Sequence, residues 1–310
     1  MRTQLIAHSR QMRALLAELK RFAATDANVL VLGETGAGKD LVARALHAAG
    51  PRRDEPFIAI DCPSLAVTLL ESELFGHERG AFTDATVAKP GRFEIAGRGS
   101  VYLDRVSELP LEMQPKLLRL VEEKRGERLG GTVPFEIRAR VIASVEPGIE
   151  DKVHEGTFRR DLYHRLKVLT LTVPPLRERV SDILPLAAVF LQQTAAGLGR
   201  NTPELSPDAE ERLKSHPWPG NVRELRHVLE RAVIAADGDR IDAAGLPIEH
   251  ADDPEAMFGT PQQRPTIEDL ERQYITLVLS EVKGNQTHAA AILGISRKAL
   301  WEKRKRYGLE

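Results

Sequence analysis

A glycine-rich segment at residues 33–40, with the sequence GETGAGKD, constrains the fold of this chain most strongly. It follows a short apolar run at residues 28–32 and precedes a stretch of helical spacing at residues 41–47, which gives the order strand, loop, helix. In that order the pattern GxxxxGK predicts a phosphate-binding loop, because backbone N–H groups and the dipole of the following helix favour a bound anion. Lys39 is expected to reach the β- and γ-oxygens of a nucleotide.

This loop supplies a first set of candidate ligands for ATP or ADP. Asp40 stands where such loops usually have Ser or Thr, so a magnesium ion bound with the nucleotide would be met by a carboxylate, directly or through water. The loop residues predicted to bind the nucleotide are Gly33, Glu34, Thr35, Gly36, Ala37, Gly38, Lys39, Asp40 and Leu41.

Apolar runs and helical patterns alternate along the first half of the chain. Short runs at residues 57–60, 100–103 and 140–143 are separated by helical patterns such as the one at residues 111–123. This alternation is typical of a parallel sheet with crossover helices. We therefore predict an α/β nucleotide-binding core over residues 1–172.

The pattern then changes to helices alone. Two consecutive prolines interrupt the chain after the core, and helical patterns follow at residues 182–194, 207–216 and 222–236. Residues 173–248 are therefore expected to form a small helical lid subdomain.

A linker and a second helical module are expected at the C-terminal end. The stretch from residue 251 to residue 265 carries three prolines and no apolar periodicity, so residues 249–265 are predicted to be a linker. Helical spacing resumes after it, and residues 266–310 are predicted to form a compact helical module.

Composition excludes several classes of protein. The chain is 42% hydrophobic and 29% charged, with 44 basic and 45 acidic side chains, which indicates a soluble globular protein rather than a disordered one. The single cysteine, Cys62, cannot form an internal disulfide and favours a reducing compartment. No run of 18 apolar residues occurs. We therefore expect a cytoplasmic protein, and exclude secretory, membrane and disulfide-scaffold classes.

Positive charge is concentrated at the C-terminal end. Residues 283–310 contain seven Lys or Arg and two Glu, in a chain whose net charge is −1. Two short helices are indicated around a turn, since Gly294 ends one helix, Ser296 caps the next and Gly308 stops it. A run of charge is usually a solvated face, but joined to such a helix pair it predicts a module that binds duplex DNA.

Individual DNA contacts can be assigned within this module. Arg297 is the candidate for a base-edge contact, and phosphate contacts are expected from Thr287, Ser296, Lys298 and Lys305. An apolar stripe on the preceding helix is expected to join two copies, which would place two recognition helices in successive major grooves. The stripe consists of Ile267, Leu270, Tyr274, Leu277 and Leu279.

Residues 73–83, with the sequence ELFGHERGAFT, follow the glycine-rich loop at the spacing of a known family. The chain resembles the bacterial enhancer-binding proteins, which are AAA+ activators of sigma-54 RNA polymerase, and its last module resembles their Fis-type helix-turn-helix. The resemblance spans residues 6–309 and implies an AAA+ core with a parallel sheet, a helical lid and a helix-turn-helix. Further matching blocks are residues 109–119, 158–166, 174–179 and 218–225.

The resemblance implies roles for several single residues. Asp104 corresponds to the Walker B aspartate that holds magnesium. Arg159 and Arg165 stand where the family has arginine fingers, which reach the γ-phosphate bound to the neighbouring subunit of a ring. Arg223 matches the sensor arginine of the lid, and Asp61 matches an Asn or Asp that changes partner with the nucleotide.

The loop that contacts sigma-54 in this family normally reads GAFTGA, whereas residues 80–85 read GAFTDA. Phe82 and Thr83 are therefore retained as the implied contacts with the sigma factor. Asp84 replaces a glycine, and although aspartate tolerates a left-handed backbone better than most residues, it adds charge at the tip of the loop.

Two departures affect the chemistry directly. The family has a glutamate after the Walker B aspartate to orient the attacking water, and here that residue is Arg105, whose guanidinium cannot accept a proton. The sensor strand normally ends in Thr-Asn, whereas here it ends in Val145 and Glu146. Glu108 is a candidate substitute for positioning the water, although its place relative to the strand end differs from that of the missing glutamate.

Three hypotheses on function follow. In the first, a DNA-binding transcription regulator binds ATP or ADP with impaired hydrolysis, as a repressor, a partner in mixed rings with a homologue, or an activator using another sigma factor. In the second, a ring of up to six subunits hydrolyses ATP and remodels the closed complex of sigma-54 RNA polymerase. In the third, the chain is a P-loop enzyme unrelated to transcription, which requires that the last module does not bind DNA. The departures favour the first hypothesis.

Regulation is expected to lie outside the chain. The resemblance to the AAA+ core begins almost at residue 1, which leaves no room for an N-terminal receiver or ligand-sensing domain. Control is therefore expected from expression, from another protein or from the nucleotide itself.

Overall fold

The computed structural model describes residues 5–64, 67–82, 85–236, 238–248, 266–282 and 285–307. The chain divides into two compact units, Met1–Pro247 and Ile248–Glu310. The predicted core and lid share the first unit, and the boundaries at residues 172 and 248 stay predictions. The predicted linker at 249–265 lies outside the described residues.

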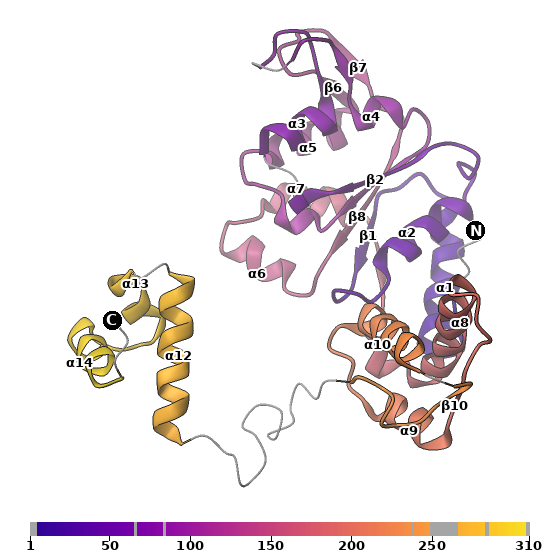
Figure 1. Cartoon of the computed structure of the whole chain (residues 1–310). Coiled ribbons are helices and arrows are strands. Elements are labelled where there is room, and N and C mark those ends of the chain that lie inside the picture. Colours follow the sequence, from indigo (N-terminus) through magenta and orange to yellow (C-terminus); the bar gives the residue numbers. More distant parts are fainter. Residues whose placement is uncertain are drawn as a thin grey trace. The chain divides into compact units, whose positions relative to one another are not determined.

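A five-stranded parallel sheet forms the centre of the first unit (Figure 1). Four of the strands coincide with the apolar runs of the sequence, which confirms the predicted α/β fold. The fifth, β9, was not predicted, because its sequence LTLT alternates apolar and polar residues over only four positions. The strand order is β2(Phe57–Asp61), β5(Ser100–Asp104), β8(Arg140–Val145), β1(Val29–Leu32) and β9(Leu169–Thr172).

Both faces of this sheet are covered, which explains why its four predicted strands read as apolar runs. Val29 and Val31 of β1 pack on one face and Leu30 packs on the other, because side chains alternate along a strand. The helices that pack on the first face are α1(Arg10–Ala23) and α2(Lys39–Ala48). Those on the second face are α3(Val67–Phe75), α5(Gln114–Glu123) and α7(Arg160–Leu166).

Shorter elements extend from this core. Two hairpins of two- and three-residue strands were not predicted, because strands so short give no alternating pattern. They pair β3(Gly76–His77) with β4(Lys89–Pro90), and β6(Arg125–Glu127) with β7(Pro134–Glu136). Two further short helices are α4(Arg92–Ile95) and α6(Ile149–His154).

The lid contains the three helices that the sequence predicts, each within three residues of its expected ends. They are α8(Ile183–Gly197), α9(Pro207–Ser215) and α10(Asn221–Ala235). A short parallel pair, β10(Glu204–Leu205) with β11(Arg240–Ile241), accompanies them. Trp218, between α9 and α10, is fully buried, and its Nε1 donates to the carbonyl of Leu213 at 2.8 Å.

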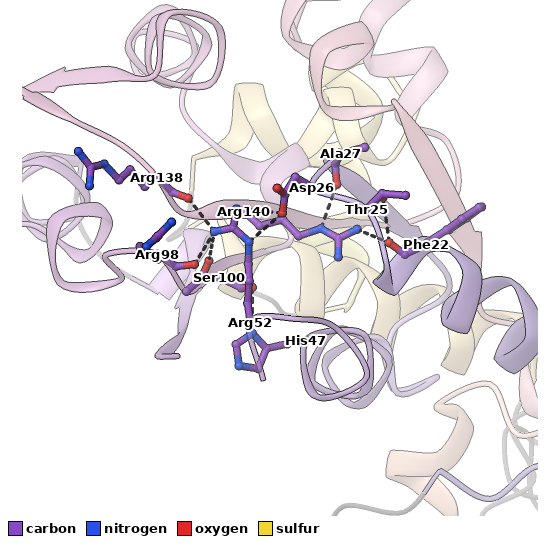
Figure 2. A network of polar contacts seen from close by, with 11 residues as sticks. Phe22, Thr25, Asp26, Ala27, His47, Arg52, Arg98, Ser100, Arg138 and Arg140 are labelled. Atoms are coloured by element: carbon purple, nitrogen blue, oxygen red, sulfur yellow. Dashed lines mark hydrogen bonds and ion pairs between the residues drawn. The ribbon is translucent and has the colours of Figure 1, made fainter. Parts of the chain in front are cut away.

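A buried and a half-buried arginine hold together the end of the sheet where its strands begin (Figure 2). Arg140, the first residue of β8, is 4% exposed and donates to the carbonyls of Ala27 at 3.0 Å and Phe22 at 2.8 Å. Arg52 donates to the carbonyl of Arg138 at 2.7 Å and pairs with Asp26 at 2.9 Å. Charged donors on backbone carbonyls make strong hydrogen bonds, so they fix the end of the sheet where the strands begin.

The second unit contains three helices in the part of the chain that the structure describes: α12(Ile267–Glu281), α13(Gln286–Ile292) and α14(Arg297–Tyr307). Its small core holds Ile275, Val278 and Leu300 with two alanines of α13. This arrangement confirms the predicted helical module. Among the described helices of the whole chain, none combines the length and apolar character needed to cross a bilayer.

Candidate functional site

A cavity of about 670 Å³ lies at the carboxyl ends of the parallel strands, between the glycine-rich loop and the lid. Ligands of open α/β folds bind at this end of the sheet. The cavity brings together ten of the residues predicted from the sequence. These are Thr35, Gly36, Gly38, Lys39, Asp40, Leu41, Asp61, Asp104, Arg105 and Arg223. The lining residues not predicted as ligands are Glu146, Phe190, Val222, Arg226, His227 and Glu230.

The glycine-rich loop wraps around the side chain of Lys39. Lys39 is 7% exposed, and its ammonium donates to the carbonyls of Gly33 at 2.7 Å and Glu34 at 3.1 Å. Burial lowers the pKa of Lys39, and the nearby carboxylates of Glu146 and Asp104 oppose that shift. Helix α2 begins at Lys39, so the N–H groups of its first turn and a buried cation meet at one point. This arrangement fits a phosphate.

Asp104 ends strand β5 at the mouth of the cavity. Its Oδ1 accepts hydrogen bonds from the hydroxyl of Tyr102 at 2.8 Å and from the hydroxyl of Ser144. Both donors come from the sheet itself, and they fix the orientation of the carboxylate. Among the described residues, no group of three His, Cys, Asp or Glu side chains is arranged to hold a metal ion. A magnesium ion here would therefore depend on phosphate and water oxygens for most of its ligands.

Arg105 is directed into the same cavity and paired with Asp61. Its Nη2 donates to both carboxylate oxygens of Asp61, at 2.7 Å and 2.9 Å. Hydrogen bonding to Asp61 is the main reason why the pKa of Arg105 is raised. The backbone of Arg105 is left-handed, with φ 53°, and its N–H donates to Ser144 Oγ at 2.9 Å. A non-glycine residue in this region carries about 1 kcal/mol of strain, which the sheet must offset.

The sensor-strand residues lie on opposite sides of the strand end. Val145 is 1% exposed and packs in the core, whereas Glu146 lines the cavity and accepts a hydrogen bond from the hydroxyl of Thr35. Glu108, the candidate substitute for positioning water, pairs instead with Lys152 at 2.5 Å and is not among the residues that line the cavity.

The first turn of lid helix α10 is docked on the glycine-rich loop. The carbonyl of Gly36 accepts hydrogen bonds from the N–H groups of Val222 at 3.0 Å and Arg223 at 3.3 Å. The fully buried Asn221 donates to the carbonyl of Thr35 and to the carboxylate of Glu34, both at 3.1 Å. The loop and the lid are thus one hydrogen-bonded assembly.

Two further arginines hold the loop from outside the cavity. Arg177 makes a two-pronged ion pair with Glu34, at 2.5 Å and 2.8 Å, which is the main cause that lowers the pKa of Glu34 to about 2. Arg179 is 4% exposed and donates to the carbonyl of Ala37 at 2.7 Å. Burial lowers the pKa of Arg179, and Asp182 opposes that shift.

Sequence reasoning missed Asn221, Arg177 and Arg179 as supports of the loop. The sequence held one signal for Asn221, the tripeptide Pro-Gly-Asn, which is typical of a tight turn. Asparagine is favoured in the left-handed region, and Asn221 indeed has φ 54°. No local pattern marks the two arginines, since their partners lie more than 140 positions away in the chain.

Substitution of Gly36 should break the contact between loop and lid. Gly36 has φ 73°, and a Cβ there would lie 2.3 Å from the carbonyl oxygen of Gly220. We expect Gly36→Ala to lower the free energy of unfolding by about 3 kcal/mol, from backbone strain plus this overlap. Gly38→Ala is the matched control, because Gly38 has φ 99° with no atom within 4 Å of its Cβ position. It should cost about 1 kcal/mol. If urea unfolding showed the same loss of stability for both variants, the docking of the lid on the loop would be contradicted.

The two candidate arginine fingers lie away from the cavity of their own chain. The Arg159 side chain pairs with Asp161 at 2.7 Å, and the Arg165 side chain pairs with Glu122 at 2.9 Å. Both are more than 40% exposed. Their role toward a neighbouring subunit stays a prediction.

Of the two implied sigma-54 contacts, the structure describes one. Phe82 is 36% exposed, and its ring contacts the ring of His77 edge-on at 5.0 Å between centroids. Thr83 lies outside the described residues, as does Asp84.

In the second unit, all five candidate DNA contacts are exposed. Ser296 caps α14, since its Oγ accepts from the N–H of Ala299 at 3.1 Å, as predicted. Of the apolar stripe on α12, Tyr274 is 54% exposed, whereas Leu279 packs against the core of the unit. The exposed candidates are Thr287, Ser296, Arg297, Lys298 and Lys305. The structure does not describe the side chains of the other three stripe residues, Ile267, Leu270 and Leu277.

Three family models match the chain, one after another. A "Sigma-54 interaction domain" matches residues 5–172, an "AAA+ ATPase lid domain" matches residues 177–261, and "Bacterial regulatory protein, Fis family" matches residues 266–307. The order of the three matches is the order of domains predicted from the sequence.

Individual proteins are similar over nearly the whole chain. The alginate biosynthesis transcriptional regulatory protein AlgB of Pseudomonas aeruginosa is 43% identical over 304 residues, which cover 97% of this chain and 67% of that protein. The regulatory protein AtoC of Escherichia coli is 40% identical over 313 residues, which cover 99% and 68%. The crystal structure of NtrX from Brucella abortus in complex with ADP has a TM-score of 0.75 and 35% identity, covering 99% of this chain and 70% of that one.

Proposed function

Because the chain belongs to the family of sigma-54-dependent transcriptional regulators, with an AAA+ domain and a Fis-type DNA-binding domain, we propose that it is a nucleotide-binding regulator with impaired hydrolysis. One observation carries this proposal: in the cavity, Arg105 follows Asp104 and is bound to Asp61, where a water-positioning carboxylate is needed.

The residues of the cavity fit a nucleotide. Lys39, the start of α2 and the loop glycines form an anion site, and a cavity of about 670 Å³ is of the size that holds small ligands. NtrX, which is similar over 99% of this chain, has been crystallised with ADP and with ATP in complex. Asp104 and Asp40, which both line the cavity, are the carboxylates that would hold magnesium, whose charge would neutralise phosphate oxygens.

The same residues give little support to turnover. In hydrolysis a carboxylate or amide holds the attacking water, and three acidic side chains near the strand ends have partners of their own. Asp61 is paired with Arg105, Glu108 with Lys152, and Glu146 accepts from Thr35. The site therefore supports binding more than chemistry.

The alternative is a working ring ATPase that remodels the sigma-54 closed complex. The exposed guanidinium groups of Arg159 and Arg165 and the exposed ring of Phe82 favour it, since these are groups that such a ring would use between subunits and toward its target. Sigma-54 RNA polymerase and a second copy of the chain, in assemblies from dimer to hexamer, are therefore proposed partners beside duplex DNA. A DNA-binding regulator with these partners would act in the cytoplasm.

A comparison of binding with turnover tests the proposal. Calorimetric titration with ATP and with ADP, each with magnesium, should give saturable binding. Steady-state phosphate release should stay at background as the protein concentration is raised to the range where rings form. Hydrolysis that rises steeply with protein concentration would establish the ring ATPase in place of the regulator proposed.

Binding of DNA should separate base contacts from phosphate contacts in α14. Affinity for duplex DNA should fall steeply with salt, because basic side chains displace counterions from phosphates. Arg297→Ala should reduce the ratio of specific to non-specific affinity by about 10-fold, as the loss of one base contact does. Lys305→Ala should weaken both affinities alike and lower the salt slope by about 1. Fluorescence anisotropy at several salt concentrations measures both quantities, and equal losses of specificity in the two variants would contradict the assignment.

A further inference from the structure

Helix α14 exposes one large aromatic side chain among its cations. Trp301 is 55% exposed, and the Lys305 ammonium lies over its indole ring at 5.4 Å from the ring centroid. An indole has a large apolar surface, so an exposed one among cations is available for an apolar contact with a ligand that the cations attract.

Another face of α14 packs inside the unit. Leu300 is 1% exposed and packs in the core, and the hydroxyl of Tyr307 donates to Glu271 of α12 at 2.5 Å. Lys303 pairs with the same carboxylate. Since successive residues of a helix are about 100° apart, Trp301 is turned away from this inner face.

Trp301 shares its face with the candidate DNA contacts. Arg297 and Lys305 are four positions before and after Trp301, and Lys298 is three positions before it, so the four side chains form one continuous surface. We call this surface the α14 outer face. Its polar members are all cations, which favours a polyanion over a second copy of the same face.

We propose that Trp301 reads sequence in the major groove, where its indole makes an apolar contact with the 5-methyl group of a thymine. The proposal rests on the proposed DNA-binding function and adds a specificity residue to it. In the major groove, thymine is the base that presents a methyl group, and apolar side chains distinguish it by contact. Lys305, held over the indole, would then be placed to meet the phosphate beside that base.

Removal of single methyl groups from DNA tests this contact. Duplexes are first selected from a randomised pool by the full chain, and each thymine of the selected site is then replaced by uracil, which lacks only the methyl. One position in each half-site should weaken binding by about fourfold, the effect of one buried methyl group. Trp301→Ala should be insensitive to that replacement, whereas Trp301→Phe should keep the sensitivity. Ile292→Ala is the control and should keep the sensitivity, because Ile292 is an exposed apolar residue on α13, outside the α14 outer face.

Tryptophan emission gives a second readout. The chain has two tryptophans, and Trp218 is fully buried in the first unit, so a change of emission on adding DNA should come from Trp301 and disappear in Trp301→Ala. If uracil replacement weakens the parent and Trp301→Ala alike, the inference is wrong. It is also wrong if Trp301→Ala alters only the oligomeric state in sedimentation. If the parent selects no duplex, the DNA-binding function fails together with this inference.

Discussion

Arg105→Glu should raise the steady-state rate of ATP hydrolysis by about one to two orders of magnitude over the parent, since a positioned acid or base contributes about 10² to 10⁴ to such a rate. The variant places an acceptor at the end of β5, next to Asp104 and inside the cavity. It also removes a cation that stabilises a bound triphosphate in its ground state, which does not lower the barrier. Recovery should be incomplete, because Val145 and Glu146 still stand where the sensor strand has its polar pair.

Two controls separate the acceptor from the loss of charge. Arg105→Met removes the cation without supplying an acceptor for the water and should leave hydrolysis near the parent's rate. Glu108→Gln removes a carboxylate that is paired with Lys152 and does not line the cavity, so it should change nothing. Hydrolysis by the parent at the rate of Arg105→Glu, with both abolished by Arg159→Ala, would refute impaired turnover and favour the ring ATPase.

Lys39→Ala should weaken the binding of ATP and ADP by at least about 100-fold, the effect of removing a charged hydrogen-bond partner from a buried site. The ammonium of Lys39 is the buried cation of the loop, and its loss also leaves the carbonyls of Gly33 and Glu34 without that donor. Nucleotide at about 100 times its dissociation constant should stabilise the parent by about 2.7 kcal/mol and should not stabilise the variant.

A matched lysine outside the cavity controls for lost charge. Lys116 pairs with Glu71 on the far side of the core and does not line the site, so Lys116→Ala should keep the full increase in melting temperature with nucleotide. Equal increases for Lys39→Ala and the parent, with equal affinities in a direct titration, would mean that the nucleotide binds elsewhere.

The strands that could be predicted from the sequence are those that are buried on both faces of the sheet and therefore form short apolar runs. Strands β1, β5 and β8 are covered on both faces and therefore read as apolar runs, whereas β9 carries threonines at alternate positions and gave too weak a signal. The site was predictable at the ends of strands, because the carboxyl ends of parallel strands meet at one edge of a sheet. Asp61 and Asp104 end two such strands, and their roles are implied by the resemblance to the family.

Contacts that join distant segments were not predictable from one sequence. The pairing of Arg105 with Asp61 depends on the register of β2 beside β5, and nothing near either residue specifies it. The docking of Asn221 on the glycine-rich loop joins residues more than 180 positions apart. Trp301 was missed for another reason: at helical spacing an aromatic residue is usually part of a core, and its exposure is visible only once α14 is packed.

The docking of α10 has a consequence for how signals pass through the chain. The N–H groups of Val222 and Arg223 donate to the carbonyl of Gly36, a residue that also lines the nucleotide cavity. Displacement of the lid would therefore break hydrogen bonds of the glycine-rich loop. Coupling between two binding events is reciprocal. If the nucleotide changes the affinity of a partner that binds the lid by some factor, that partner changes the affinity of the nucleotide by the same factor. A chain with little turnover can therefore still act as a sensor, in which occupancy of the nucleotide cavity alone changes the affinity for a partner.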